Sequence, residues 1–196
     1  MQCREDKRGF TLVELLVVIS VSVILTTMII VYGRLGEEQL IVFKEQAKMI
    51  GVLNRAKGLA TEKYVESTSD SEEICGYGIR FLKNVKPFKY QIFEDRFPTC
   101  DTQGRPYAYD IGDDVLLPNE SHELSNRIAN LIIKDGFGAI LVANNPTIIF
   151  TAPNLDAKIT SDNGVGEINE FYFEITAIGG AKSIVRINNA GQISSQ

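Results

Sequence analysis

The chain reads Lys7-Arg8-Gly9-Phe10-Thr11-Leu12-Val13-Glu14 near its start, and an almost unbroken apolar run follows from Leu15 to Tyr32. The 23 residues from Phe10 to Tyr32 would form a helix of roughly 35 Å, enough to cross a hydrocarbon core of about 30 Å. Glu14 lies inside this segment, where an ionisable residue costs about 2.5–3.5 kcal/mol on insertion scales. The segment therefore predicts a membrane-spanning helix in which Glu14 has a function.

Three interpretations of this segment compete. A cleaved secretory signal has a shorter apolar region of about 7–15 residues, with a small-residue cleavage site such as Val31-Tyr32-Gly33 after it. A plain signal anchor explains the length and the basic flank but gives Glu14 no role. The third interpretation is cleavage before the apolar run, between Gly9 and Phe10, so that the run stays on the mature protein.

Residues 8–14 resemble the class III leader junction of type IV prepilins and type II secretion pseudopilins. In that junction a basic leader ends in Gly, and the mature chain begins with Phe and carries an acid four residues later. The resemblance implies that a prepilin peptidase cuts between Gly9 and Phe10 and that Phe10 is then N-methylated. It also implies that Glu14 pairs with the terminal amine of Phe10 in a neighbouring subunit and sets axial register. The alternative is that Glu14 only extends to the lipid headgroups.

Basic residues precede the apolar run and predict its orientation: Arg4, Lys7 and Arg8. They favour a single-pass protein with its N-terminus in the cytoplasm and its C-terminal domain outside. The resemblance to prepilins and pseudopilins implies that the membrane is the inner (cytoplasmic) membrane and that the C-terminal domain lies in the periplasm. The predicted divisions are a cleaved leader (1–9), a transmembrane and assembly helix (10–32), an amphipathic continuation (33–63) and a soluble β-rich domain (64–196).

Apolar residues recur every three or four positions beyond Gly36 and predict that the helix continues to about Lys63, with one stripe packed on a sheet. The stripe comprises Leu40, Phe43, Ala47, Ile50, Leu53, Ala56 and Ala60. Alternation with period two then predicts strands over 77–81, 88–92, 147–151, 171–176 and 183–188, the last two flanking Gly179-Gly180 as a hairpin.

A second helix is predicted near residues 120–134, with Ser121 as its N-cap and Leu124, Ile128, Leu131 and Ile132 on one face. The fold class is therefore α+β, with a long N-terminal helix packed on a mainly antiparallel sheet, the pilin-like lollipop of the resembled family. The segments 53–57, 74–78 and 183–192 also resemble the GspH/FimT group of minor pseudopilins and minor pilins. The predicted helix near 120–134 departs from that group.

Cys75 and Cys100 remain if Cys3 leaves with the leader. On the oxidising side of the membrane a disulfide between them is favoured, and closing its loop of about 25 residues is worth roughly 3 kcal/mol. The alternatives are two reduced, buried thiols, or a zinc site, which the spacing and the single His disfavour.

Basic and aromatic residues interleave over residues 80–90, as in surfaces that bind single-stranded nucleic acid. The basic members are Arg80, Lys83, Lys86 and Lys89. Lysines that protect exposed strand edges from aggregation explain the same composition. The net charge of −5 disfavours non-specific nucleic-acid binding.

The sequence predicts a protein that is not an enzyme and that holds no cofactor or metal. His122 is expected to be a solvated residue at a helix start, and no nucleophile elbow, phosphate loop or HExxH motif is present. Acidic clusters at Asp110, Asp113 and Asp114 and at 162–167 offer oxygen ligands for calcium but lack the EF-hand spacing.

We expect a structural minor pseudopilin or pilin-like subunit of a type II secretion or type IV pilus fibre. Its expected partners are other pilin or pseudopilin subunits, the prepilin peptidase, the membrane and exported protein cargo. The alternative is a minor pilin that binds DNA during uptake.

Overall fold

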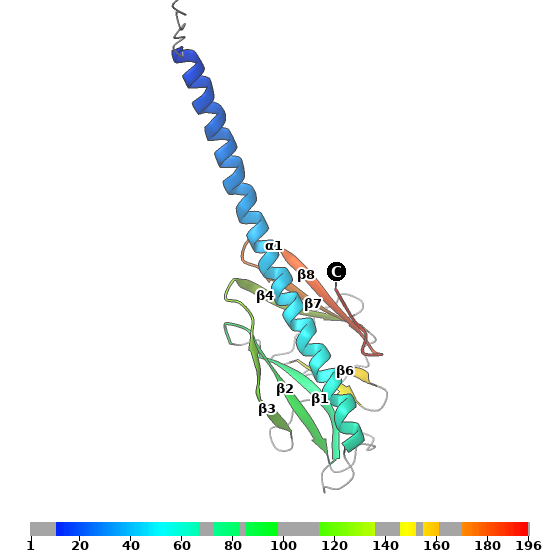
Figure 1. Cartoon of the computed structure of the whole chain (residues 1–196). Coiled ribbons are helices and arrows are strands. Elements are labelled where there is room, and N and C mark those ends of the chain that lie inside the picture. The colour runs from blue at the N-terminus through cyan, green and yellow to red at the C-terminus, as the bar shows by residue number, and fades with distance from the viewer. Residues whose placement is uncertain are drawn as a thin grey trace, which may run out of the picture. The chain divides into compact units, whose positions relative to one another are not determined.

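The computed structural model of the chain describes residues 11–66, 73–82, 85–97, 114–135, 146–151, 155–160 and 170–195 (Figure 1). The elements in these residues are α1 (Leu12–Glu66), β1 (Glu73–Leu82), β2 (Lys89–Phe97), β3 (Val115–Glu123), β4 (Ile128–Asp135), β5 (Thr147–Thr151), β6 (Asp156–Thr160), β7 (Glu170–Ala177), β8 (Lys182–Asn188) and β9 (Ile193–Ser195). The predicted α+β class is confirmed, because a long N-terminal apolar helix is followed by antiparallel sheets.

The chain forms two compact units, Met1–Glu37 and Glu38–Gln196. The described part of the first unit is the beginning of α1, from Leu12 to Glu37. The second unit contains α1 from Glu38 onward and all the described strands. The predicted end of the helix, at about Lys63, agrees with its observed end at Glu66.

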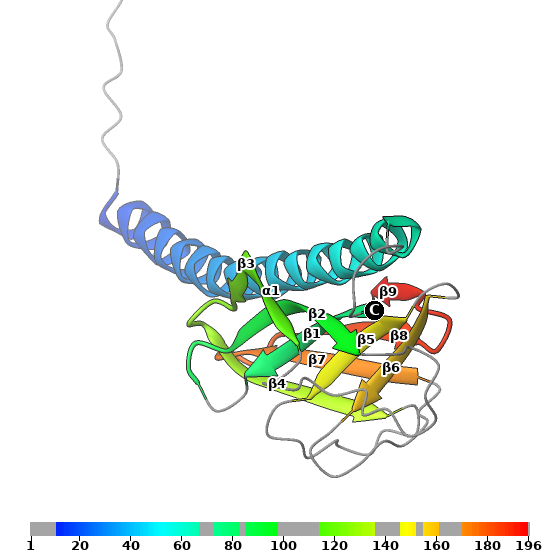
Figure 2. The ribbon, with the colours of Figure 1, turned by 90° about the horizontal axis from the view of Figure 1, so that it is seen from below.

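Two antiparallel sheets make up the second unit. One sheet has the strand order β3-β2-β1-β5-β6 and the other has the order β4-β7-β8-β9. From Glu38 onward, α1 lies along the strands (Figure 2). A backbone hydrogen bond of 2.9 Å from Ala157 to Asn189 links the edge strand β6 to the turn after β8.

One hydrophobic core joins the helix to both sheets. The ring of Phe81, from β1, stacks on the ring of Phe173, from β7, with centroids 5.2 Å apart. Alternate residues of β1, β2, β5, β7 and β8 face this core, as the period-two pattern predicts. The buried side chains include Tyr77, Ile79, Phe81, Tyr90, Ile92, Ile148, Phe150, Phe171, Ile175, Val185 and Ile187.

The predicted helix near 120–134 is wrong. Ser121, its predicted N-cap, lies in β3 opposite Gln91, Leu124 lies between β3 and β4, and Ile128, Leu131 and Ile132 belong to β4. A bulge between Ile128 and Asn130 shifts the alternation of β4, so that Ile128 and Leu131 are both buried. Their spacing of three imitates a helix face, although the bulge in a strand produces it.

The predicted stripe on α1 is correct only in its second half. Leu53, Ala56 and Ala60 are buried, whereas Leu40 is 69% exposed and Phe43 is 58% exposed. The face toward the core begins instead with Val42, Met49 and Val52, and it includes the polar residues Glu45 and Gln46. Gln46 is accommodated because its Nε2 donates a 2.9 Å hydrogen bond to the carbonyl of Ile184.

Glu174, on β7, joins three strands through ion pairs on the face of its sheet away from the core. Its carboxylate accepts hydrogen bonds from Lys134 of β4 and, at 2.7 Å, from Lys182 of β8. The hydrogen bonds from Lys134 and then Lys182 hold the pKa of Glu174 below its ordinary value of 4.5. The charged carboxylate therefore stabilises the fold above about pH 4.5, and this contribution is lost as the pH falls through the lowered folded-state pKa.

Replacing Glu174 with Gln should lower the urea midpoint at pH 7 and change it less at about pH 3, because the contribution of the charge declines below about pH 4.5, where the unfolded chain binds a proton. The measurement is urea unfolding of the detergent-solubilised protein followed by circular dichroism. Glu123→Gln is the control, because Glu123 pairs with Lys89 at 2.5 Å but is 51% exposed, where an ion pair contributes little. Equal losses for Glu174→Gln at both pH values would contradict the charge-based account.

Gly78 of β1 is required by close packing. A Cβ at this position would lie 2.3 Å from the ring of Phe93 and 2.9 Å from the carbonyl oxygen of Ile148. Gly58 in α1 is the matched contrast, because a Cβ there would have no atom within 4 Å.

Gly78→Ala should lower the free energy of unfolding by about 1–3 kcal/mol through overpacking. Gly58→Ala should raise it by up to about 1 kcal/mol, since alanine favours a helix interior. Denaturant unfolding of both variants checks the pair, and a neutral Gly78→Ala would show that Phe93 can move aside.

Candidate functional site

The first turn of α1 contains a capping box formed by Thr11 and Glu14. The backbone N–H and the hydroxyl of Thr11 each donate to Oε2 of Glu14 at 3.0 Å, and the N–H of Glu14 donates to the Thr11 hydroxyl at 3.2 Å. The Thr-x-x-Glu spacing satisfies N–H groups that a helix start otherwise leaves unpaired. Within the described residues, Oε1 of Glu14 accepts no hydrogen bond.

The segment after the capping box exposes apolar side chains around its whole circumference. Every residue from Thr11 to Gly33 is exposed, Leu12 and Ile24 among them. Among the described residues, this is the one helix that is long and apolar enough to cross a membrane, judged by length and composition. Such a surface requires cover from lipid or from other helices.

The hydroxyl side chains of this segment are satisfied within the helix. Ser20 donates to the carbonyl of Leu16 at 2.8 Å, and Thr26 donates to the carbonyl of Ser22 at 2.7 Å. Ser22 and Thr27 bond in the same way to carbonyls one turn earlier. Because no hydroxyl needs an outside partner, these residues do not oppose insertion into lipid as unpaired polar groups would.

Several predicted site residues lie outside the described part of the chain. Among them are Gly9 and Phe10, at the predicted cleavage site, and Cys100. Cys75 is buried in β1. The disulfide between Cys75 and Cys100 and the cleavage after Gly9 therefore stay predictions.

The structure brings only part of the predicted basic patch together. Lys89 forms its ion pair with Glu123, and Nζ of Lys86 lies 5.9 Å from the centre of the Phe88 ring. Arg80 is half-buried in β1, and Lys83 lies outside the described residues. The negative charge beside Lys89 weakens the attraction that a nucleic-acid phosphate would experience there.

His122 is not at a helix start, so that prediction is wrong. It lies in β3, with its ring 5.5 Å from the ring of Tyr90 and its Nε2 3.4 Å from Oε2 of Glu120. Tyr90 is buried, and burial followed by the nearby charge of Glu45 raises its pKa above the ordinary value of 10. The neutral tyrosine packs under His122 and supports β3.

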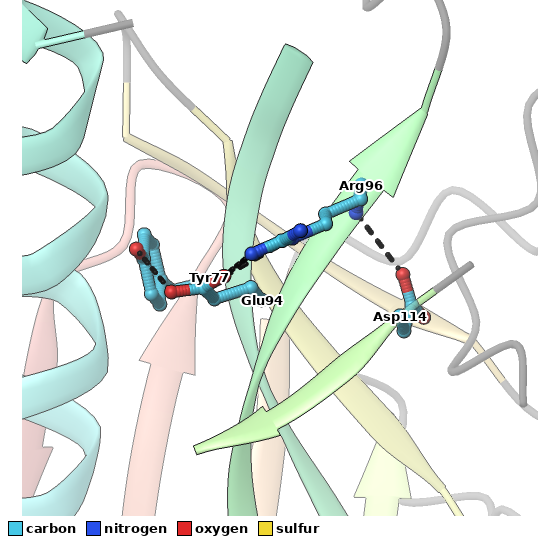
Figure 3. A network of polar contacts seen from close by, with 4 residues as sticks. All are labelled: Tyr77, Glu94, Arg96 and Asp114. Carbon is cyan, nitrogen blue, oxygen red and sulfur yellow. Dashed lines mark hydrogen bonds and ion pairs between the residues drawn. The ribbon is translucent and has the colours of Figure 1, made fainter. Parts of the chain in front are cut away.

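A polar network missed by the sequence analysis connects β1, β2 and the start of β3 (Figure 3). The Tyr77 hydroxyl donates to Glu94 at 3.1 Å, and Arg96 bonds the other Glu94 oxygen at 2.8 Å. The backbone N–H of Arg96 donates to Asp114 at 3.1 Å. Burial and then the charge of Glu94 raise the pKa of Tyr77, so Tyr77 remains a donor at neutral pH.

The alternation of inward-facing residues in β2 could have predicted this network. Glu94 continues the inward series of Tyr90 and Ile92, which places a charge where an apolar residue is expected. A buried carboxylate requires a partner. The network lacks a nucleophile paired with a base, and it serves to join strands.

No group of three or more His, Cys, Asp and Glu in the described ranges is placed to hold a metal ion. Asp114 is described and bonds Arg96. Asp110, Asp113 and the acidic cluster at 162–167 lie outside these ranges.

Comparison with known proteins identifies the start of the chain. Residues 4–30 match the prokaryotic N-terminal methylation motif. The motif is the leader of type IV prepilin-like proteins, and here it covers the capping box and most of the exposed apolar segment. No curated protein and no solved structure matches the chain.

The methylation motif suggests a type IV pilin-like or pseudopilin subunit that is anchored in a membrane. It implies processing by a prepilin peptidase and assembly with other pilin subunits. Proteins with this motif are structural and not enzymatic. The candidate functional site is therefore the beginning of α1, where the motif and the exposed apolar surface coincide.

Proposed function

We propose that the chain is a structural subunit of a type IV pilin-like fibre, assembled through the segment Phe10–Tyr32. The observation that carries the proposal is the coincidence of the methylation motif with an apolar helix exposed on all sides. Such a helix lies in the lipid bilayer before assembly and packs against identical or related helices in a fibre. The second unit, with its own core, would then face the periplasm.

Glu14 is the proposed register device of the fibre. Its Oε2 caps its own helix, and its Oε1 is available to the terminal amine of Phe10 in a neighbouring subunit. A negative charge at a helix N-terminus is stabilised by the helix dipole. Burying that charge without a cation typically costs about 3–5 kcal/mol, so subunits staggered by the wrong amount would be excluded.

The finer role that we propose is a minor pseudopilin of type II secretion, which helps to initiate or cap the periplasmic pseudopilus. The order of the helix and strands in the second unit supports a relation to the GspH/FimT group. Exported cargo is the proposed further partner. DNA binding through Arg80, Lys83, Lys86 and Lys89 gains no support from the pairing of Lys89 with Glu123.

Intact mass spectrometry of protein extracted from membranes tests the processing. We expect a chain that begins at Phe10 and carries one N-methyl group, with Cys75 and Cys100 two hydrogens short of the reduced form. Reduction before the measurement is the control for the disulfide. A terminus at Met1 or at Arg34 would contradict the proposed cleavage.

Two variants separate the charge of Glu14 from its role in the cap. Glu14→Gln keeps an acceptor for Thr11 but removes the charge, and it should reduce incorporation into fibres about a hundredfold or more, as expected for an unpaired buried charge. Thr11→Ala keeps the charge and loses a cap worth about 1 kcal/mol, so it should still assemble.

The measurement is the amount of each variant in sheared fibres, relative to its amount in the membrane, in cells with the partner subunits. If Glu14→Gln assembles as well as the parent, the register role is wrong. If Thr11→Ala is the more defective variant, the cap and not the intersubunit pair controls assembly.

A further inference from the structure

Tyr32 ends the exposed apolar segment of α1. The residues from Thr11 to Val31 include no aromatic side chain, and those from Leu15 to Val31 include no charged one. Tyr32 itself is 63% exposed. In the sequence, Arg34 and Glu37 follow within five residues. Tyr32 therefore stands where a stretch long enough to span a bilayer gives way to charged residues.

The hydroxyl of Tyr32 differs from the other hydroxyls of this segment. Five hydroxyls form hydrogen bonds within the helix, namely those of Thr11, Ser20, Ser22, Thr26 and Thr27. Within the described residues, the Tyr32 hydroxyl forms no hydrogen bond. A hydroxyl without a partner costs about 2–7 kcal/mol in an apolar medium. The Tyr32 hydroxyl therefore requires a polar partner outside its own helix.

The boundary of a lipid bilayer supplies such a partner. Every residue from Thr11 to Gly33 is exposed, and the segment is long and apolar enough to cross a membrane. The ring of a tyrosine is apolar and its hydroxyl is polar. Tyrosine is for this reason enriched at the level of the lipid headgroups, where the ring contacts acyl chains and the hydroxyl contacts polar groups. The chemistry of Tyr32 thus matches the headgroup region.

The position of Tyr32 also determines the depth of Glu14. Glu14 precedes Tyr32 by 18 residues (32 − 14), and both belong to the continuous helix α1. Eighteen residues rise about 27 Å, or about 25 Å along the membrane normal at an ordinary tilt of about 20°. The hydrocarbon core is about 30 Å thick. With Tyr32 at one boundary of the core, Glu14 lies about 3–5 Å inside the other, which is less than one helical turn.

We propose that Tyr32 contacts the headgroups of the outer leaflet, and that Glu14 consequently lies at the inner boundary of the hydrocarbon core before the chain enters a fibre. The inference rests on the proposed membrane anchoring and orientation, and it adds the depth at which α1 is held. An ionisable residue costs most at the centre of a bilayer. At the inner boundary Glu14 keeps contact with headgroups and water, so the cost of an unpaired charge arises only when the subunit leaves the membrane.

The absence of Trp from the sequence permits a test with single-Trp reporters. The full chain carrying Tyr32→Trp, Ile24→Trp or Val13→Trp is reconstituted in liposomes of phosphatidylcholine and phosphatidylglycerol. Ile24 precedes Tyr32 by eight residues (32 − 24) and lies about 12 Å deeper, so it reports the middle of the bilayer. Val13 is adjacent to Glu14 in the sequence and reports its depth.

Tryptophan emission is measured with lipids brominated near the headgroup and, separately, with lipids brominated near the ends of the acyl chains. We expect the shallow bromines to quench Tyr32→Trp and Val13→Trp more strongly than the deep bromines do. The deep bromines should quench Ile24→Trp more strongly. This order follows from a helix that crosses the bilayer with its two ends at the two boundaries.

A second substitution in the Ile24→Trp chain tests whether Tyr32 holds the helix at this depth. Tyr32→Leu removes the side chain that favours the headgroup region, so the helix should occupy a wider range of depths and the ratio of deep to shallow quenching should fall. Val31→Leu is the matched control, because it exchanges one apolar side chain for another beside Tyr32. It should leave the ratio unchanged.

Stronger quenching of Val13→Trp by the deep bromines would overturn the inference, because Glu14 would then lie well inside the hydrocarbon core. An unchanged ratio in the Tyr32→Leu chain would also overturn it, because Tyr32 would not determine the depth. Flotation after an alkaline wash distinguishes these failures from that of the proposed function. A chain that does not float with the liposomes overturns the anchoring and the inference together, whereas a floating chain with either result overturns only the inference.

Discussion

The second unit depends on a single face of α1 that packs into a core shared with both sheets. Val42, Met49 and Leu53 fill the first part of this face, and Ala56 and Ala60 allow close approach farther along. Two sheets with one buried face each need a third layer or each other to exclude water, and here they use both. Loss of the helix would therefore expose the core of both sheets at once.

Buried polar side chains lie beside the apolar residues of that core. Gln46 is satisfied by a backbone carbonyl of β8, and Glu94 is satisfied by Tyr77 and Arg96. The Gln46 contact joins α1 to β8, which are distant in the sequence, and it adds specificity to the way the layers meet. The Tyr77 contact joins the consecutive strands β1 and β2. An unsatisfied group in the same place would cost about 1–3 kcal/mol, which makes these positions sensitive to substitution.

The sequence predicts local features well and long-range corrections poorly. The strands at 147–151 and 183–188 follow from alternation, because every residue of these segments keeps the ladder in register. The bulge at Ile128 and Asn130 and the burial of Gln46 depend on β7 and β8, which are far away in the chain. Hydrophobic spacing alone cannot predict the bulge or the burial of Gln46. For this reason the spacing in β4 predicts a helix where the structure has a strand. The candidate site could be predicted from the sequence because its motif is contiguous from residue 4 to residue 30.

In the proposed mature chain, the capping box also limits how far the N-terminal amine can move relative to α1. The helix begins immediately after Thr11, so a cut after Gly9 leaves Phe10 as the only residue ahead of the cap. Because the amine of Phe10 would then be one residue ahead of the cap, it could pair only with a carboxylate close to the helix start. Successive residues of a partner helix differ by about 1.5 Å in rise. In the proposed fibre, the start of α1 would then fix the axial stagger of neighbouring subunits to within one residue of the partner helix.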